Sequence, residues 1–239
     1  MNDVGAELLE SKSMDLEEAY VDEYWSTYRQ HIHTLLAWGY ADSRNKVQAR
    51  HDEPDITGFI AEAIQERLDT FDCPIWCNQI VIKDDPPIPG GGRTGRKRWR
   101  PDLVFESVER KPRPRYYFEA KRLRKQQHKS INAYLGEDGL QCFISGRYAH
   151  ESDEAGMLGY VQCDDINTWV ERLQLAIDQD CQGNKEVLLL SPQRNIQIVD
   201  AFPLEWMSKH DRHTGKSIFI HHILLDYCIT TSPGPMVAI

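Results

Sequence analysis

Two short apolar segments on either side of a charged, proline-containing connection constrain the fold of this chain more than any other feature. Residues 103–105 (Leu-Val-Phe) and 116–118 (Tyr-Tyr-Phe) read as short strands, and the connection over 109–114 contains two prolines. Prolines in such a connection favour a turn over a continuous helix. We therefore predict that the two segments pair as a β-hairpin.

Ionisable residues stand at one end of each predicted strand. Asp102 directly precedes the first strand, and Glu119 and Lys121 follow the second. Because side chains alternate between the two faces of a strand, Glu119 and Lys121 point the same way. Pairing of the strands would bring two carboxylates and one ammonium together at one end of the sheet. Carboxylates hold Mg²⁺, and a lysine beside the ion can stabilise a hydroxide and the charge that develops during phosphodiester hydrolysis.

The spacing of these residues resembles that of the PD-(D/E)XK nucleases, the restriction endonuclease-like superfamily. Pro101-Asp102 is followed, after sixteen intervening residues, by Glu119-Ala120-Lys121, and the resemblance covers about residues 50–125. It implies an α/β fold with a restriction endonuclease-like core, in which a mixed central β-sheet is flanked by α-helices. It also implies dependence on Mg²⁺, for which Mn²⁺ can substitute. Asp102 and Glu119 would be metal ligands, and Lys121 would be the water-orienting base.

Many relatives contribute a further glutamate from the helix that precedes the first core strand. Glu53 is our first candidate for this catalytic metal ligand, and Glu62 is the second. An acid in the first turn of a helix is also favoured by the helix dipole, so Glu53 has a structural explanation of equal weight. Gln79 is a weaker candidate for a contact to the ligands. The alternative for the whole group is a surface ion-pair cluster at the strand ends.

The distribution of charge favours a polyanionic ligand, although the chain is acidic overall. The formal net charge is -9, but residues 93–125 contain thirteen basic residues against four acidic ones. Local potential, and not the total charge, attracts nucleic acid. The residues that we expect to contact phosphates are Arg93, Arg96, Lys97, Arg98, Arg100, Arg122, Arg124 and Lys125. The alternative is that the charge run only keeps a surface solvated.

Hydrophobic periodicity predicts the remaining helices and the domain organisation. Residues 1–13 are expected to form a flexible tail, and residues 14–239 a single PD-(D/E)XK nuclease-like domain, since one core can serve about 200 to 250 residues. An N-terminal helical extension is expected from Leu16 to Leu36. Two further helices are expected over 55–68, capped by Asp55 or Thr57, and over 166–177, capped by Asp165.

Further strands are expected over 75–83, 187–190 and 196–202. The six cysteines show no disulfide framework spacing, so we expect buried or free thiols in a reducing cytoplasm. The histidines at 210, 213, 221 and 222 are expected to be exposed or to face DNA, because matching zinc ligands are lacking. No apolar run is long enough to span a membrane, and no export signal is indicated.

These features predict a metal-dependent endonuclease that hydrolyses DNA phosphodiester bonds. Residues 143–148 (FISGRY) and 156–161 (GMLGYV) look like stretches of some bacterial nucleases, which would make the chain an antiviral defence enzyme directed against foreign DNA. No base-reading motif is evident, so we expect low specificity, or specificity supplied by a partner protein such as an ATPase. A homodimer would provide the two active sites that double-strand cleavage needs.

Two alternatives stay open at this point. An RNase of the same fold would use the same phosphate chemistry, because contacts to the 2′-hydroxyl cannot be recognised in the sequence. A catalytically silent nucleic-acid-binding or scaffold module would share the fold without the reaction. The intact Asp, Glu and Lys favour an enzyme over a silent module.

Overall fold

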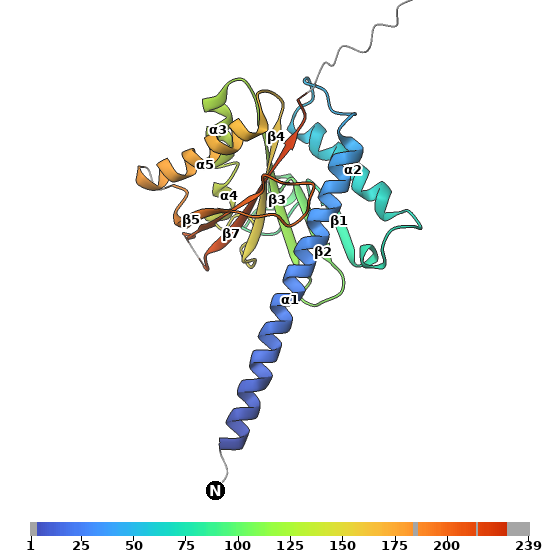
Figure 1. Ribbon diagram of the computed structural model, residues 1–239, viewed down its shortest axis with the longest axis vertical. Helices are drawn as coiled ribbons and strands as arrows, with labels where there is room; N and C mark the ends of the chain where they lie inside the picture. The colour runs from blue at the N-terminus through green and yellow to red at the C-terminus, as the bar shows by residue number, and fades with distance from the viewer. Residues whose placement is uncertain (1–3, 184–185, 214, 229–239) are drawn as a thin grey trace, which may run out of the picture.

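The chain forms a mixed β-sheet with helices on both faces in the computed structural model, which describes residues 4–183, 186–213 and 215–228 (Figure 1). Side chains are described from residue 23 onward within these ranges, except that of residue 181. The helices are α1 (Val4–Ser43), α2 (Glu53–Leu68), α3 (Gln127–Leu135), α4 (Gln141–Ile144) and α5 (Ile166–Gln182), with short 3-10 turns η1 (Ile75–Gln79) and η2 (Gly95–Lys97). The strands are β1 (Ile80–Asp84), β2 (Leu103–Ser107), β3 (Arg115–Leu123), β4 (Glu154–Val161), β5 (Leu189–Asn195), β6 (Trp206–His210) and β7 (Ile218–Asp226).

The seven-stranded sheet has the order β1-β2-β3-β4-β7-β6-β5. Strands β1, β2 and β3 form an antiparallel meander, β4 and β7 continue it in parallel, and β6 and β5 add antiparallel pairs at the far edge. The expectation of an α/β fold with a mixed central sheet flanked by helices is confirmed. The expected hairpin is also confirmed, since Leu103 pairs with Phe118 and Phe105 with Tyr116.

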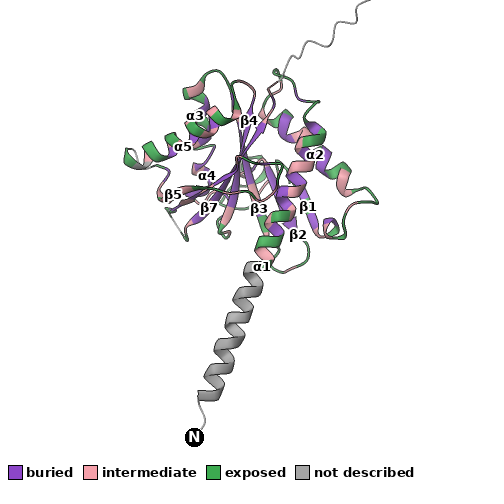
Figure 2. Ribbon diagram, in the orientation of Figure 1, coloured by how far each residue is buried: buried purple, intermediate pink, exposed green. Residues whose placement is uncertain are grey.

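Alternation along β3 divides the core into two layers. Tyr116, Phe118 and Ala120 belong to the core on the side of α1 and α2. Leu123 belongs to the second core, formed with α3, α4 and α5 on the opposite face. Buried residues gather on the strands and on the inner sides of the helices (Figure 2). Tyr117, Glu119 and Lys121 therefore share a face with Leu123.

Helix α1 lies across the first face of the sheet. The Tyr28 hydroxyl donates to the carbonyl of Phe105 at 3.0 Å, and the Tyr40 hydroxyl donates to that of Asp226 at 2.8 Å. The helix begins at Val4. Residues 4–13, which we expected in a flexible tail, therefore belong to α1, and residues 1–3 lie outside the described part. Residues 4–15 lack proline, and more than half of them are Ala, Leu, Glu, Lys or Met, which are strong helix formers.

Helix α2 begins earlier than expected. Its N-cap is Asp52, and not Asp55 or Thr57, which the sequence suggested. Asp52 and Asp55 form a capping box, in which the amide of each residue donates to the carboxylate of the other at 3.3 and 3.2 Å. This start places Glu53 as the first residue of the helix, beside Pro54, which suits a first helical turn.

Several other elements differ from the sequence-based expectation. Residues 75–79 form the 3-10 turn η1, and residues 196–202 are not a strand. The strand expected over 187–190 begins at Leu189 and runs to Asn195. β4, β6 and β7 were not anticipated. The helix expected over 166–177 is confirmed with its Asp165 cap, whose carboxylate accepts the Thr168 amide at 3.2 Å.

The cysteines and histidines correct two further expectations. Cys73 and Cys77 are joined by a disulfide, whereas Cys142, Cys163 and Cys228 are free thiols. The histidines at 210, 221 and 222 are buried, and only the side chain of residue 213 among the four is exposed. Buried polar rings need partners. The His222 ring is hydrogen-bonded to the Ser208 hydroxyl at 2.6 Å and stacks on Trp206. Within the described residues, no helix has the length and apolar character needed to cross a bilayer.

Candidate metal and phosphate site

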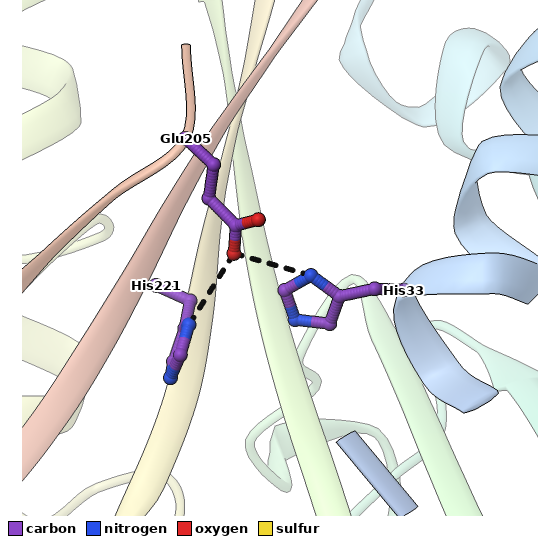
Figure 3. A group of neighbouring side chains, drawn as sticks. All are labelled: His33, Glu205 and His221. Carbon is purple, nitrogen blue, oxygen red and sulfur yellow. Dashed lines mark hydrogen bonds and ion pairs between the residues drawn. The ribbon is translucent and has the colours of Figure 1, made fainter. Parts of the chain in front are cut away.

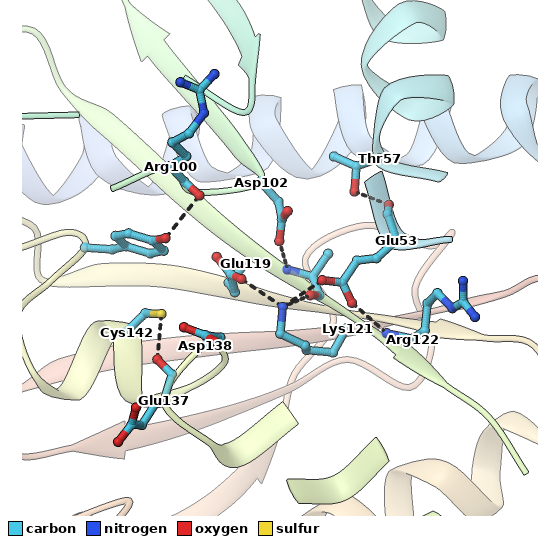
Figure 4. A network of polar contacts seen from close by, with 12 residues as sticks. Glu53, Thr57, Arg100, Asp102, Glu119, Lys121, Arg122, Glu137, Asp138 and Cys142 are labelled. Carbon is cyan, nitrogen blue, oxygen red and sulfur yellow. Dashed lines mark hydrogen bonds and ion pairs between the residues drawn. The ribbon is translucent and has the colours of Figure 1, made fainter. Parts of the chain in front are cut away.

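Four of the predicted site residues lie together where α2 begins beside β3 (Figure 4). One carboxylate oxygen from each of Glu53, Asp102 and Glu119 lies within 4.8 Å of the others. Lys121 Nζ donates to Glu53 Oε1 and to Glu119 Oε1, at 2.8 Å in each case. The structure therefore brings together three acids and one amine from three separate elements.

The hairpin fixes the position of two of these acids. Glu119 and Lys121 project from the same face of β3, as strand alternation requires. Asp102 stands just ahead of β2, and its Oδ2 accepts the backbone amide of Ala120 from the paired strand at 2.6 Å. Lys121 Nζ also donates to the carbonyl of Ala120 at 2.6 Å. The backbone of β3 thus holds both the Asp102 carboxylate and the Lys121 amine.

Glu53 is positioned by the start of α2. Its Oε2 accepts the backbone amide of Arg122 at 3.1 Å, which ties the helix to β3. Below it, the Thr57 hydroxyl donates to the Glu53 carbonyl at 2.9 Å and lies 2.8 Å from the buried Tyr160 hydroxyl of β4. Sequence reasoning missed Thr57 and Tyr160 as supports of the site, since nothing in the local pattern links them. Only the fold brings α2 and β4 into contact.

Burial and mutual repulsion set the protonation of this group. Burial raises the pKa of Asp102 to about 6, although Lys121 and the Ala120 amide act to lower it. Burial and the neighbouring Asp102 raise the pKa of Glu119 to about 9. Burial acts to lower the pKa of Lys121, but Glu119, Glu53 and Asp102 outweigh it and raise that pKa. The amine is therefore a stable cation, and the raised pKa of Glu119 keeps that acid protonated at neutral pH unless a cation binds beside it.

The donor set fits a hard divalent cation. Glu119 Oε2 is buried and has no hydrogen-bond partner among the described residues. A buried carboxylate oxygen without a partner is costly unless a cation or a donor meets it. Mg²⁺ prefers oxygen ligands and is usually held by one or two carboxylates together with water and substrate phosphate. Glu53, Asp102 and Glu119 can supply such ligands.

A basic pocket of about 690 Å³ adjoins the acidic group. Glu53 and Lys121 form part of its wall, so the pocket opens directly onto the candidate metal ligands. Its other lining residues are Ala49, Asp52, Pro54, Arg122, Arg124, Lys125, Gln126, Lys129, Ser130, Ala133, Gln162 and Cys163. The cationic and neutral polar side chains among these residues are of the kinds that bind phosphate oxygens.

The predicted phosphate-contacting residues separate into two groups. Arg122, Arg124 and Lys125 line the pocket, and Lys129 joins them from α3. The residues of the preceding loop, Arg93, Arg96, Lys97, Arg98 and Arg100, do not line it. Arg100 pairs with Asp85 at 2.7 Å, and the Arg93 guanidinium lies 5.3 Å from the Trp99 ring centre.

The two weaker candidates from the sequence lie away from the acidic group. Glu62 is exposed on α2, 3.8 Å from the Lys46 amine. Gln79 ends η1, where its amide donates to Glu109 at 3.5 Å. Between the two glutamates considered for the third acid, the structure places Glu53 with Asp102 and Glu119. Helix position decides this, because Glu62 lies more than two turns further along α2.

Comparison with known proteins adds no assignment: no protein-family model, curated protein or solved structure matches this chain.

Proposed function

We propose that the protein is a metal-dependent nuclease of the PD-(D/E)XK type that hydrolyses phosphodiester bonds of DNA. The observation that carries this proposal is the Lys121 amine held between Glu53 and Glu119, with Asp102 in the same group. The resemblance of Pro101-Asp102 and Glu119-Ala120-Lys121 to the superfamily motif supports it, as does the mixed sheet flanked by helices. The family assignment, the reaction and the metal are all parts of the proposal.

Each residue would have a definite role in the reaction. Glu53, Asp102 and Glu119 would hold Mg²⁺, which neutralises phosphoryl oxygens and lowers the pKa of a bound water. The raised pKa of Lys121 favours a charged hydrogen-bond donor over a general base. Its ammonium would orient the attacking water and stabilise the negative charge that builds on the phosphoryl group.

The pocket suggests how the substrate is held. Arg122, Arg124, Lys125 and Lys129 lie beside the acids and would contact consecutive phosphates. Such contacts give affinity without sequence choice, in keeping with an effector whose specificity comes from a partner protein. Defence against foreign DNA, and a homodimer for double-strand cleavage, are the settings in which such an enzyme would act.

The test is cleavage of three substrates by the purified chain. Supercoiled plasmid, single-stranded DNA and tRNA are incubated with Mg²⁺, Mn²⁺ or EDTA. We expect nicking of plasmid with either metal, no cleavage in EDTA, and loss of cleavage in Asp102→Asn. Asp85→Asn is the matched control, since Asp85 lies outside the acidic group and pairs with Arg100.

Other outcomes would support an alternative function or exclude the acidic group from the reaction. Cleavage of tRNA alone would make the enzyme an RNase. Binding without cleavage at any metal concentration would make it a silent nucleic-acid-binding module. Cleavage that survives Asp102→Asn, or that persists in EDTA, would remove the acidic group from the reaction.

A further inference from the structure

A second group of potential metal ligands lies in the core, on the face of the sheet opposite Glu119. His33 of α1, Glu205 just ahead of β6 and His221 of β7 turn toward one another (Figure 3). One ligand atom from each lies within 4.8 Å of the others. Their exposed fractions are 0%, 2% and 1%. The His33 ring contacts the rings of Tyr116 and Phe118, at centroid distances of 6.2 and 6.4 Å, so this group is separate from the candidate nuclease site.

The distances within this group suit a small metal ion. His33 Nδ1 lies 3.1 Å from Glu205 Oε1, and His221 Nδ1 lies 3.3 Å from the same oxygen. Ligands held about 2.0 to 2.2 Å from a tetrahedral zinc ion lie roughly 3.3 to 3.6 Å from each other. Each imidazole nitrogen therefore lies about as far from the carboxylate oxygen as two ligands of one ion would lie from each other.

Several ring nitrogens of His33 and His221 make no hydrogen bond to any residue that the structure describes. Both nitrogens of His33 and Nε2 of His221 are buried without a hydrogen-bond partner among the described residues. His33 Nδ1 is near Glu205 Oε1, yet its geometry does not make a hydrogen bond. His221 Nε2 lies 3.7 Å from Glu154 Oε2, beyond hydrogen-bond distance. Buried imidazole nitrogens without a hydrogen bond are costly, and a ring nitrogen that carries no proton can ligate a metal.

Glu205 is an acid buried in the core between the two histidines. Its carboxylate accepts from His221 at 3.3 Å and from the Ile198 amide at 3.4 Å. The nearby Arg29 guanidinium is engaged by Glu154 in two hydrogen bonds, at 2.7 and 2.6 Å. The two imidazoles contact this carboxylate at 3.1 and 3.3 Å, and a buried carboxylate needs counter-charge to offset its desolvation. A divalent cation would supply this charge.

We propose that His33, Glu205 and His221 form a structural binding site for a late first-row divalent cation, Zn²⁺ by preference. Two imidazole nitrogens and one carboxylate oxygen are ligands that Zn²⁺ favours, whereas Mg²⁺ favours an all-oxygen set. The second oxygen of Glu205 or a water molecule would take the fourth position. The ion would join α1, the segment before β6 and β7, which are far apart in the sequence. It would stabilise the fold, because the unfolded chain does not hold these ligands together.

The test is metal binding to the purified full-length chain. Metal content is measured by mass spectrometry after purification without chelator. The chain is then stripped with EDTA and titrated with Co²⁺, whose visible absorption reports tetrahedral nitrogen and oxygen ligands, followed by competition with Zn²⁺. We expect one equivalent of Zn²⁺ or Co²⁺ bound with tetrahedral geometry per chain, displacement of that Co²⁺ by Zn²⁺, and a higher melting temperature with metal.

Variants assign the site. We expect His33→Gln, Glu205→Gln and His221→Gln each to weaken Co²⁺ binding by at least about tenfold, the lower end of the loss seen when even an outer contact to a metal ligand is removed. His31→Gln is the matched control from the same helix, because its ring stacks on Trp76 at 4.1 Å and lies outside the group. Asp102→Asn should also keep the Co²⁺ spectrum, which separates this site from the candidate nuclease site.

Three results would overturn the inference. The first is a folded wild-type chain that gives no tetrahedral Co²⁺ spectrum. The second is a Co²⁺ spectrum that is unchanged in folded Glu205→Gln. The third is a spectrum that disappears in Asp102→Asn but remains in the histidine variants. If the three ligand variants do not fold, the wild-type titration and its Zn²⁺ competition decide the question alone.

Discussion

Lys121 on β3 and Glu53 at the start of α2, 68 positions apart in the chain, are joined by a 2.8 Å hydrogen bond between Nζ and Oε1. The bond connects α2 with β3, and the same Lys121 amine also donates to Glu119. The amine is therefore the counter-charge of the acidic group and donates hydrogen bonds to two of its three acids.

Replacing this amine should separate its structural and chemical roles. Lys121→Met leaves buried carboxylates without their cation, so we expect the metal-free chain to lose about 3 to 5 kcal/mol of unfolding free energy. Mg²⁺ should restore part of this stability, because it supplies the missing charge. Cleavage should nevertheless fall by about 10²- to 10³-fold at saturating Mg²⁺, the loss typical of removing one transition-state donor.

Urea unfolding with and without Mg²⁺, and single-turnover cleavage, check this prediction. Lys83→Met is the control, since Lys83 pairs with Glu106 at 2.8 Å and lies outside the acidic group. Full cleavage by a folded Lys121→Met chain would exclude the proposed role of the amine.

The raised pKa of Asp102 predicts a pH dependence of stability. The folded chain binds a proton at Asp102 up to about pH 6, whereas the unfolded chain releases it near its ordinary value of 3.8. Between these values the folded state holds more protons, so its stability falls as pH rises through this window. Asp102→Asn should gain roughly 1 to 3 kcal/mol relative to wild type between pH 4 and pH 7 in EDTA. Unfolding series at several pH values measure this, and parallel curves for the two proteins would refute it.

The basic pocket should determine affinity for nucleic acid. Arg124→Ala and Lys129→Ala each remove a cation from the pocket wall. Each should weaken DNA binding and reduce the slope of log K against log salt by about 0.9, the value for one phosphate contact on duplex DNA. Arg113→Ala is the matched control, because Arg113 pairs with Glu106 at 2.9 Å and does not line the pocket. Binding titrations at several salt concentrations give the slopes, and equal slopes for all variants would remove the pocket from the interface.

The contact between Tyr160 and Thr57 should support Glu53 from below. Tyr160→Phe removes one buried hydroxyl at 2.8 Å from the Thr57 hydroxyl, so we expect a loss of about 0.5 to 1.5 kcal/mol. Loosening the first turn of α2 should also weaken Mg²⁺ binding. Tyr134→Phe removes a buried hydroxyl bonded to His222, in the other core. That control should lose similar stability and leave Mg²⁺ binding unchanged, as measured by titration calorimetry; an equal effect of both variants on Mg²⁺ binding would contradict the prediction.

Gly156 in β4 allows a close approach between neighbouring strands. A Cβ atom at this position would lie 2.1 Å from the Phe118 ring of β3. Gly156→Ala should therefore force the ring or the strand to shift and cost about 1 to 3 kcal/mol. Gly58→Ala on α2 meets nothing within 4 Å and should be neutral or stabilising by about 0.5 to 1 kcal/mol. Thermal melts compare the two, and a Gly156→Ala chain as stable as wild type would show that β4 tolerates the side chain.

The local sequence was sufficient for elements that depend on contacts close along the chain. The hairpin follows from two apolar segments around prolines, and the start of α5 follows from the Asp165 cap. Strand alternation alone puts Glu119 and Lys121 on one face. The basic segment at the end of β3 was likewise readable, because Arg122 lies in the strand and Arg124 and Lys125 follow it directly.

Tertiary structure decided what depends on distant segments. Sequence patterns left Glu53 and Glu62 as alternatives, and packing of α2 against β3 and β4 chose Glu53. They also suggested histidines that are exposed or face DNA, because the local pattern shows no matching metal ligands. The fold buries His221 instead, against Glu205 and His33 from other elements. Which polar groups can be buried is set by the partners that reach them, and those partners are separated along the chain by up to nearly two hundred residues.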